Sequence, residues 1–187
     1  MVSPDAIEDA ICTVIKANHE LKILLVMVEK YGAENTEWKL ERGLVEALMT
    51  ERLMDACFTM VSPGVSVTSV SANGDVPQET MKKIVENTDA QYIFKAQAKV
   101  IEADVSKNSV FKDNGMKSYS VAISGQLINV ENNEIEASVA EHSQILGISP
   151  EHALRYKAGK SRTFAIVDKV LDSMMQKITK RWASELV

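Results

Sequence analysis

The chain has few of the residues that build metal centres and covalent active sites. Among its 187 residues are two cysteines and three histidines. His19, His142 and His152 stand far apart, so no pair has the sequence spacing of zinc ligands. Cys57 has no histidine nearby, and its apolar surroundings disfavour a reactive thiolate. We therefore expect no catalytic residues, no metal, no cofactor and no enzymatic activity.

The two cysteines, Cys12 and Cys57, are 45 positions apart and form no close-spaced motif. Both lie in apolar patterns, which favours two free thiols that behave as small buried hydrophobic side chains. A disulfide between them remains the alternative, because cysteine arithmetic alone does not decide whether two cysteines pair.

Long apolar runs and excess positive charge are also missing. No run approaches the ~20 residues that a helix needs to cross a bilayer, and we expect no transmembrane segment. A net charge of −5 opposes a phosphate-binding surface, so no nucleic acid is expected as a partner. An apolar fraction of 45% is that of a globular protein. The length suits a single domain over 1–187, with an N-terminal helix in 1–19 and an α/β core in 20–187.

Hydrophobic periodicity predicts the order of the elements. The run from Ile23 to Val28 is continuously apolar, which is typical of a strand covered on both faces. Helices are predicted at 3–18, 36–53, 77–87 and 150–182, and strands at 23–28, 56–61, 92–105, 118–130 and 134–144. Early alternation and a late meander indicate an α/β (α+β) fold. Right-handed crossovers then favour a five-stranded mixed sheet, order 2-1-3-4-5, with helices on both faces.

The last two strands flank a turn at Asn132-Asn133. An even-length turn pairs residues symmetrically about it, yet the apolar residues earlier in the fourth strand have the opposite parity. A β-bulge at Gly125 would reconcile the two halves. The pairs expected from this turn are Val130 with Ile135 and Ile128 with Ala137.

Two further expectations concern single positions. Glu134 and Glu136 alternate along the fifth strand and are interpreted as the solvated face of an edge strand. Gly43 falls inside the second predicted helix, where it costs about 1 kcal/mol relative to alanine. Close packing of that helix on the sheet would compensate for the cost.

Two segments are candidate sites. Ligands of open α/β sheets bind at the carboxyl ends of strands where the strand order reverses, which favours a cleft at Glu29, Lys30, Tyr31 and Gly32. A plain strand-to-helix loop is the alternative there. The connection at 107–116 carries apolar residues at a turn, a feature typical of contacts with another protein or with a second copy. These residues are Val110, Phe111 and Met116.

Several segments together resemble a known domain. They are the strand from Lys22 to Glu29 with its helix, the run Asn87-Thr88-Asp89-Ala90-Gln91-Tyr92-Ile93, the strands around Asn133-Glu134-Ile135, and the helix end Lys180-Arg181-Trp182. By pattern more than by identity, about residues 20 to 187 resemble the domain shared by the curli secretion channel protein CsgG, the N-terminal part of TolB and flagellar assembly protein T.

The resemblance implies an anticodon-binding-like α/β fold that serves assembly or scaffolding in the bacterial envelope, without catalysis. It implies a periplasmic or outer-membrane-peripheral location, with any leader or lipid attachment in a preceding N-terminal part; a cytoplasmic location stays open. The connection at 107–116 is too short for a spanning β-hairpin, whose two strands need ~9–11 residues each, so we do not expect a membrane pore. The alternatives are a nucleic-acid-binding domain of this fold and an enzyme or small-ligand site after Glu29.

Overall fold

The computed structural model describes residues 9, 12–13, 21–32, 43–61, 70–102, 115, 117–149 and 165–185. Within them lie eight elements, and residues 9, 12 and 13 are also helical. The elements are β1 (Lys22–Gly32), α2 (Leu44–Asp55), β2 (Thr59–Val61), α3 (Gln78–Glu86), β3 (Tyr92–Glu102), β4 (Lys117–Asn129), β5 (Ile135–Gly147) and α6 (Ala165–Glu185).

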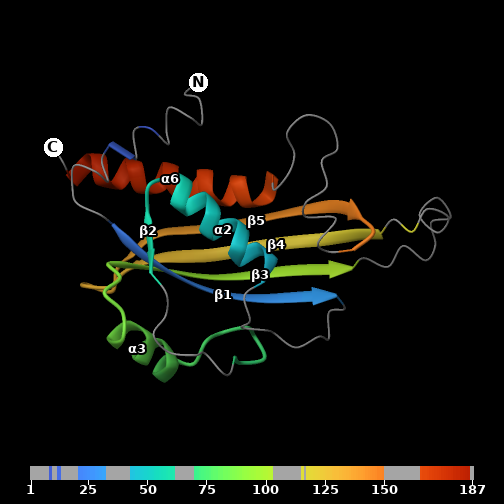
Figure 1. The fold of residues 1–187 in the computed structure, drawn as a ribbon, viewed down its shortest axis with the longest axis horizontal. Helices are drawn as coiled ribbons and strands as arrows, with labels where there is room; N and C mark the ends of the chain where they lie inside the picture. Colours follow the sequence, from blue (N-terminus) through green and yellow to red (C-terminus); the bar gives the residue numbers. More distant parts are fainter. Residues whose placement is uncertain are drawn as a thin grey trace.

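The strands form one five-stranded sheet in the order β2-β1-β3-β4-β5. β1 pairs in parallel with β2 and β3, whereas β3, β4 and β5 pair in antiparallel fashion. Helices α2 and α6 lie on one side of the sheet, and α3 lies on the other (Figure 1). The predicted mixed sheet, its strand order and the helices on both faces are confirmed.

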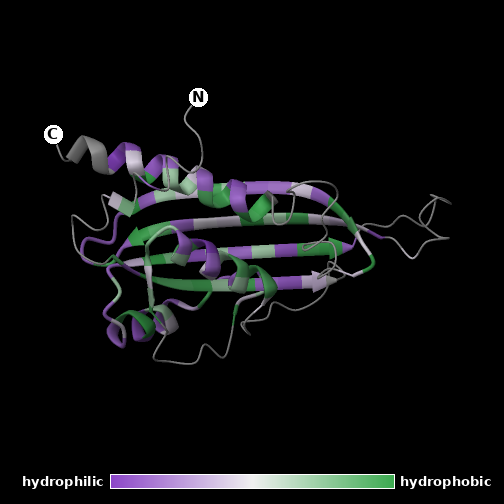
Figure 2. Cartoon of the chain, turned by 45° about the horizontal axis from the view of Figure 1, so that its top comes forward, coloured by the Kyte–Doolittle hydropathy of each residue, from purple (hydrophilic) through white to green (hydrophobic). Residues whose placement is uncertain are grey.

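The larger core fills the space between the sheet and helices α2 and α6. Alternate residues of each strand face these helices, and hydrophobic and hydrophilic positions alternate along β3, β4 and β5 (Figure 2). On α6, a stripe at helical spacing comprises Val167, Leu171, Met174 and Ile178, all of which are buried. The spacing of four, three and four residues between these positions is that of an amphipathic helix, and it fixes which side of α6 meets the sheet.

A smaller core lies under α3. It comprises Leu24, Val26, Val28, Val76, Ile84, Ala90 and Ile93. Because β1 contributes apolar residues to both cores, it is buried on both faces, as its continuous apolar run predicted. Only Ile84 of α3 is fully buried, so α3 covers its part of the sheet less closely than α2 and α6 cover theirs.

The predicted bulge at Gly125 is wrong in position. Gly125 pairs regularly with Val139, and the register shifts between Leu127 and Ile128 instead. Glu136 is the extra residue of β5 at this shift. β4 itself needs no bulge. Its apolar residues change from alternate positions of one parity to the other because both faces of the strand are covered. Observed pairs are Leu127 with Ala137 and Ile128 with Ile135, in place of those expected.

A different structural feature explains why a glycine occupies position 125. A Cβ atom there would lie 2.8 Å from the ring of Phe94 and 3.0 Å from the Cβ of Ala96. Phe94 is fully buried in the larger core. The missing side chain at Gly125 therefore lets this ring pack on the sheet, a common role of glycine within strands.

The interpretation of Glu136 as a solvated carboxylate is wrong. Its side chain is 5% exposed, and its Oε2 lies 2.7 Å from Nε of Arg181 on α6. Glu134 is exposed and forms a second ion pair with Arg181, at 2.9 Å. Arg181 also donates to the carbonyl of Ile135, and Lys177 donates to the carbonyl of Ser138. Basic side chains of α6 thus cover the outer edge of β5, which discourages pairing with another strand.

The second helix begins later than predicted. Gly43 precedes α2 at its N-cap, in an extended conformation, and does not lie within the helix. The buried residues of α2 include Val45, Leu48 and Met49. The predicted helical residues 36–42 lie outside the described part of the chain, as do 150–164 of the last helix.

The two cysteines form a disulfide, so the expectation of free thiols is wrong. The Cα atoms of Cys12 and Cys57 lie 5.3 Å apart. Cys57 follows the end of α2 with a φ of 71°. The amide of Cys57 donates to Met54 and that of Phe58 to Leu53, which is the hydrogen-bond pattern of a Schellman cap. A cysteine therefore holds a position that usually favours glycine, and its side chain ties the cap to the N-terminal helical residues.

Candidate functional site

The sheet face turned away from α2 and α6 is rich in small and polar side chains. The apolar residues Ile93, Ile101, Ile128 and Leu146 point to this face. The small and polar residues of β3, β4 and β5 that point to it include Lys95, Gln97, Lys99, Ser120, Ala122, Ser124, Gln126, Ser138, Ala140, His142 and Gln144. Those on β4 and β5 are exposed. We call this set the open face. It contains no carboxylate, although the whole chain has a net charge of −5.

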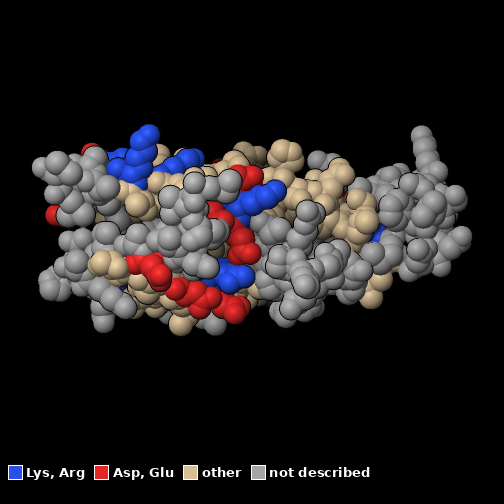
Figure 3. All heavy atoms as spheres, turned by 90° about the horizontal axis from the view of Figure 1, so that it is seen from above, with Lys and Arg blue, Asp and Glu red and all other residues tan. Residues whose placement is uncertain are grey.

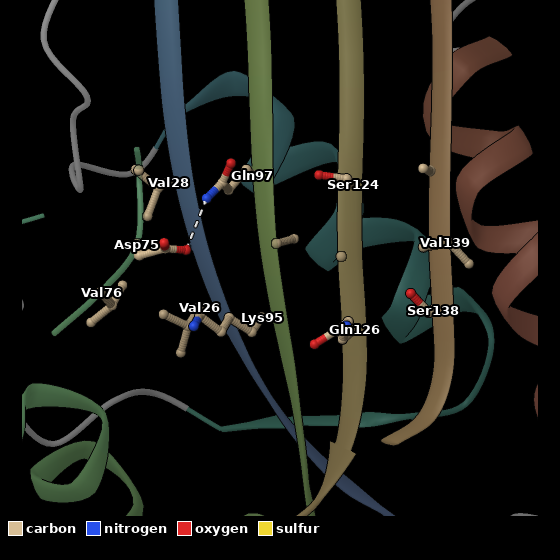
Figure 4. Close-up of a pocket in the computed structure, with 14 residues that line it drawn as sticks. Val26, Val28, Asp75, Val76, Lys95, Gln97, Ser124, Gln126, Ser138 and Val139 are labelled. Carbon is tan, nitrogen blue, oxygen red and sulfur yellow. Dashed lines mark hydrogen bonds between the residues drawn. The ribbon is translucent and has the colours of Figure 1, made fainter. Parts of the chain in front are cut away.

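A polar hollow with a volume of about 310 Å³ lies on the open face. Figure 4 shows its lining, with Lys95 beside Val26 and with Gln126 and Ser138 on the next two strands. Register places Lys95 opposite Gln126, and Gln126 opposite Ser138. These three side chains therefore form one row across β3, β4 and β5. At the other side of the hollow, the amide of Gln97 donates to Asp75 at 3.4 Å.

An apolar groove adjoins this hollow between α3 and the sheet. Its volume is about 820 Å³. The apolar residues that line it are Val76, Met81, Val85, Ile93, Ile128 and Val130. The charged residues at its rim are Glu79, Lys82 and Glu86 of α3, and Lys82 lies 4.0 Å from Glu86. The groove exists because α3 buries one residue fully and leaves Met81 and Val85 half-buried.

Lys95 lies at the junction of these two spaces. It lines both the polar hollow and the apolar groove, as does Val76. The side chain of Lys95 is half-buried, and within the described ranges its ammonium has no salt bridge. A partly desolvated cation beside neutral amides and hydroxyls favours an anionic group as its partner.

The candidate cleft after β1 is divided between the two faces of the sheet. Glu29 and Tyr31 point toward α2, whereas Lys30 lies on the opposite face, because strand side chains alternate. Glu29 is 1% exposed. Its carboxylate accepts hydrogen bonds from the Tyr31 hydroxyl and from the amides of Val45 (2.9 Å) and Glu46 (3.4 Å). The structure thus brings Glu29 and Tyr31 together at the start of α2 and separates them from Lys30.

Glu29 fills the role that a capping side chain normally has. Gly43, at the N-cap position of α2, has no side chain, and the carboxylate of Glu29 reaches the first helical amides from the sheet. Negative charge at a helix N-terminus is favourable. This explains a buried carboxylate without a ligand. A ligand cleft at Glu29, Lys30, Tyr31 and Gly32 stays a prediction, since residues 33–42 lie outside the described part.

Burial raises the pKa of the Glu29 carboxyl above its ordinary value of 4.5, and the hydrogen bonds from Tyr31, Val45 and Glu46 oppose this shift in part. Burial, the hydrogen bond to Glu29 and the charge of Glu29 likewise raise the pKa of Tyr31. Glu29 therefore holds its proton more tightly in the folded chain than in the unfolded chain. Its contribution to stability is full below pH 4.5 and declines as pH rises toward the raised folded pKa.

Glu29→Gln removes this titration, and we predict that it changes how the free energy of unfolding depends on pH. The free energy of unfolding of the wild type, minus that of Glu29→Gln, should decrease as pH rises from about 4 to about 7. Urea unfolding of both proteins at four pH values measures this difference. A difference that increases over that range would mean that the hydrogen bonds to Glu29 outweigh its burial.

Charged residues on the α2 and α6 side are arranged in pairs. Acidic and basic residues lie next to one another in the middle of Figure 3. Nε of Arg52 on α2 lies 2.9 Å from Asp168 on α6. Burial raises the pKa of Asp168 and of Asp172, and Arg52 opposes both shifts. These groups join two helices over the core, and we assign them a structural role.

Other expected features fall partly outside the described residues. Val110, Phe111 and Met116 lie in the connection between β3 and β4, of which only Gly115 is described. The two ends of that connection are held by an ion pair between Lys117 and Glu102, at 3.2 Å. In the ranges that the structure describes, no three His, Cys, Asp or Glu residues are grouped to hold a metal ion. No described helix is both long and apolar enough to cross a bilayer.

Comparison with known proteins finds similar solved structures only. No protein-family model matches the chain, and no curated protein matches its sequence. One similar structure is the PelC dodecamer from Paraburkholderia phytofirmans, with 10% identity, coverage of 85% of this chain and 86% of that chain, and a TM-score of 0.43. Another is the lipoprotein GNA1162 from Neisseria meningitidis, with 9% identity, coverage of 86% and 99%, and a TM-score of 0.42.

TolB from Acinetobacter baumannii is also similar, with 15% identity and a TM-score of 0.40. The match covers 87% of this chain and 29% of TolB. TolB is one of the proteins to which the sequence pattern pointed, but no comparison supports membership of that specific family. At such identities and TM-scores, the similarities carry no argument about what the chain does.

Sequence reasoning missed the open face and its junction residue. Lys95, Gln126 and Ser138 come from three strands, and no linear motif connects them. The alternation of polar and apolar residues along β4 indicated a polar face of the sheet, since Ser120, Ser124 and Gln126 occupy the polar positions of that strand. Whether a helix covers such positions depends on where α3 packs, which the strand pattern does not specify.

Proposed function

We propose that this chain is a non-enzymatic binding domain that works outside the cytosol, at the bacterial envelope, and contacts another protein. The observation that carries the proposal is the disulfide between Cys12 and Cys57. Structural disulfides persist in oxidising compartments such as the periplasm and are rare in the cytosol. The resemblance drawn from the sequence implies the same compartment.

The arrangement of titratable groups supports a role in binding more than a role in catalysis. The buried carboxylates Glu29 and Glu136 are occupied by a helix N-terminus and by Arg181. Groups whose pKa is shifted at an active site normally face a cleft. Burial raises the pKa of Glu29, Tyr31 and Asp168, and these three lie where α2 and α6 pack on the sheet.

The protein contact is proposed for the connection between β3 and β4. Its apolar residues Val110, Phe111 and Met116 follow strands whose ends are held by the pair of Glu102 and Lys117. Apolar residues on a connection between rigid strands suit recognition of a partner, because the sheet fixes where they are presented.

We predict that a photo-reactive residue placed at Val110 forms an adduct with a partner protein in cells that express the chain. Adding Phe111→Ser to the same chain should reduce that adduct by about tenfold, because apolar anchors dominate such contacts. Glu51, which is exposed on α2, is the matched control position. Gel analysis after irradiation measures the adducts, and thermal unfolding checks that the fold is kept.

Equal adducts at Val110 and Glu51, or an adduct that Phe111→Ser does not reduce, would exclude this connection as the contact. The envelope location is tested separately, so the two parts of the proposal can fail independently.

A further inference from the structure

We propose that the apolar groove and the polar hollow together bind a long-chain fatty acid. The alkyl chain would lie in the groove beneath α3, and the carboxylate would lie at Lys95. This site is separate from the protein contact proposed for the connection between β3 and β4.

The groove has the size and lining that an alkyl chain requires. Its volume of about 820 Å³ lies within the ~300–1,000 Å³ range of small-ligand sites. Six apolar side chains line it, and they come from β3, β4, α3 and the segments next to them. The charged residues of α3 that line it are exposed, and Lys82 and Glu86 among them lie within ion-pair distance of each other.

The hollow supplies the partners for a carboxylate. Lys95 provides a half-buried cation, and Gln126 and Ser138 provide neutral donors in the same row of the sheet. Asp75 is the one carboxylate that lines the hollow among the described residues, and Gln97 donates a hydrogen bond to it. A single cation with two neutral donors suits one negative charge, whereas phosphate recognition usually uses arginine pairs or helix amides.

The backbone around the groove favours an alkyl chain over a peptide. β3 is paired on both sides, with β1 and β4, so the groove offers no free strand edge. A peptide buried there would leave its backbone polar groups without partners, which is costly. An alkyl chain has no such groups.

The test uses the purified chain with its disulfide intact and an undecanoic acid that carries a fluorescent dansyl group. We expect saturable fluorescence, and displacement by saturated fatty acids that tightens about three- to fourfold per added methylene until the groove is filled. Lys95→Met should weaken fatty acid binding by about tenfold to hundredfold, since it removes a charge-assisted hydrogen bond. It should leave displacement by the corresponding fatty alcohol unchanged.

Two further variants separate binding from folding. Val85→Glu places a carboxylate in the groove and should abolish displacement by both acid and alcohol. Lys83→Met removes a cation from the exposed side of α3 and should change neither. Circular dichroism confirms that each variant is folded. Absence of saturable binding, equal affinity of the wild type and Lys95→Met for the acid, or displacement by an acidic peptide but not by palmitate would overturn the proposal.

Discussion

Cys12→Ser should lower the free energy of unfolding by about 2–4 kcal/mol, the typical contribution of a disulfide. The bond between Cys12 and Cys57 closes a segment with a sequence separation of 45 residues. In the chain-entropy account, a loop of this length restricts the unfolded chain by about 4 kcal/mol at 25 °C. Urea unfolding with and without a reductant measures the effect, and reductant should have no influence on Cys12→Ser.

The Schellman cap of α2 provides a sharper control. Once the disulfide is removed, a cysteine at position 57 no longer contributes a covalent bond, and the φ of 71° at this position favours glycine. In a Cys12→Ser background, Cys57→Gly should therefore be more stable than Cys57→Ala by about 1 kcal/mol. If the two proteins were equally stable, or if reductant left the wild type unaffected, the assigned bond and cap would be wrong.

Gly43→Ala should lower the free energy of unfolding by about 2–4 kcal/mol. A Cβ atom at Gly43 would lie 1.6 Å from Oε2 of Glu29, so the carboxylate would have to leave its place. It would then lose its hydrogen bonds to the amides of Val45 and Glu46 while remaining close to the core. Chemical denaturation measures the loss.

A double-mutant cycle isolates this contact. Glu29→Ala alone should cost about 2 kcal/mol, because it leaves the first amides of α2 without their acceptor. In Glu29→Ala/Gly43→Ala, the new Cβ atom occupies the space that the carboxylate leaves. The double variant should therefore lose about 1–3 kcal/mol less than the sum of the single variants. Additive losses would show that Gly43 and Glu29 do not share that space.

The strand order was predictable because it follows from local patterns. A continuously apolar β1, amphipathic helices between the early strands and alternation in the late strands restrict the sheet to a few topologies. The buried side of α6 followed in the same way from the spacing of Val167, Leu171, Met174 and Ile178.

Features that depend on long-range contacts were not predictable. Glu136 looks like a solvated strand carboxylate until Arg181 of α6 is placed beside it. Gly125 suggests a bulge until the ring of Phe94 is placed against it. Pairing of Cys12 with Cys57 likewise requires the N-terminal residues to reach the end of α2. In each case the deciding partner lies on another element, at a sequence distance that no periodicity reports.

The candidate sites divide in the same way. Glu29 was singled out because it follows the switch-point strand, and the structure gives it a structural role at the start of α2. Lys95 was not singled out, because its significance comes from the meeting of the groove under α3 with the hollow on β4 and β5. The two faces of the sheet therefore differ, with the larger core on one side and, on the other, the smaller core with the two adjoining spaces beside it.

The central claim, a binding domain that works outside the cytosol, is tested most directly by the redox state of its cysteines in the living cell. Cells expressing the full-length protein are quenched with acid and fractionated, and free thiols are labelled with a maleimide of high mass before and after reduction. We predict a chain in the envelope fraction that takes up label only after reduction. A chain in the cytosolic fraction whose two cysteines react without reduction would contradict the account.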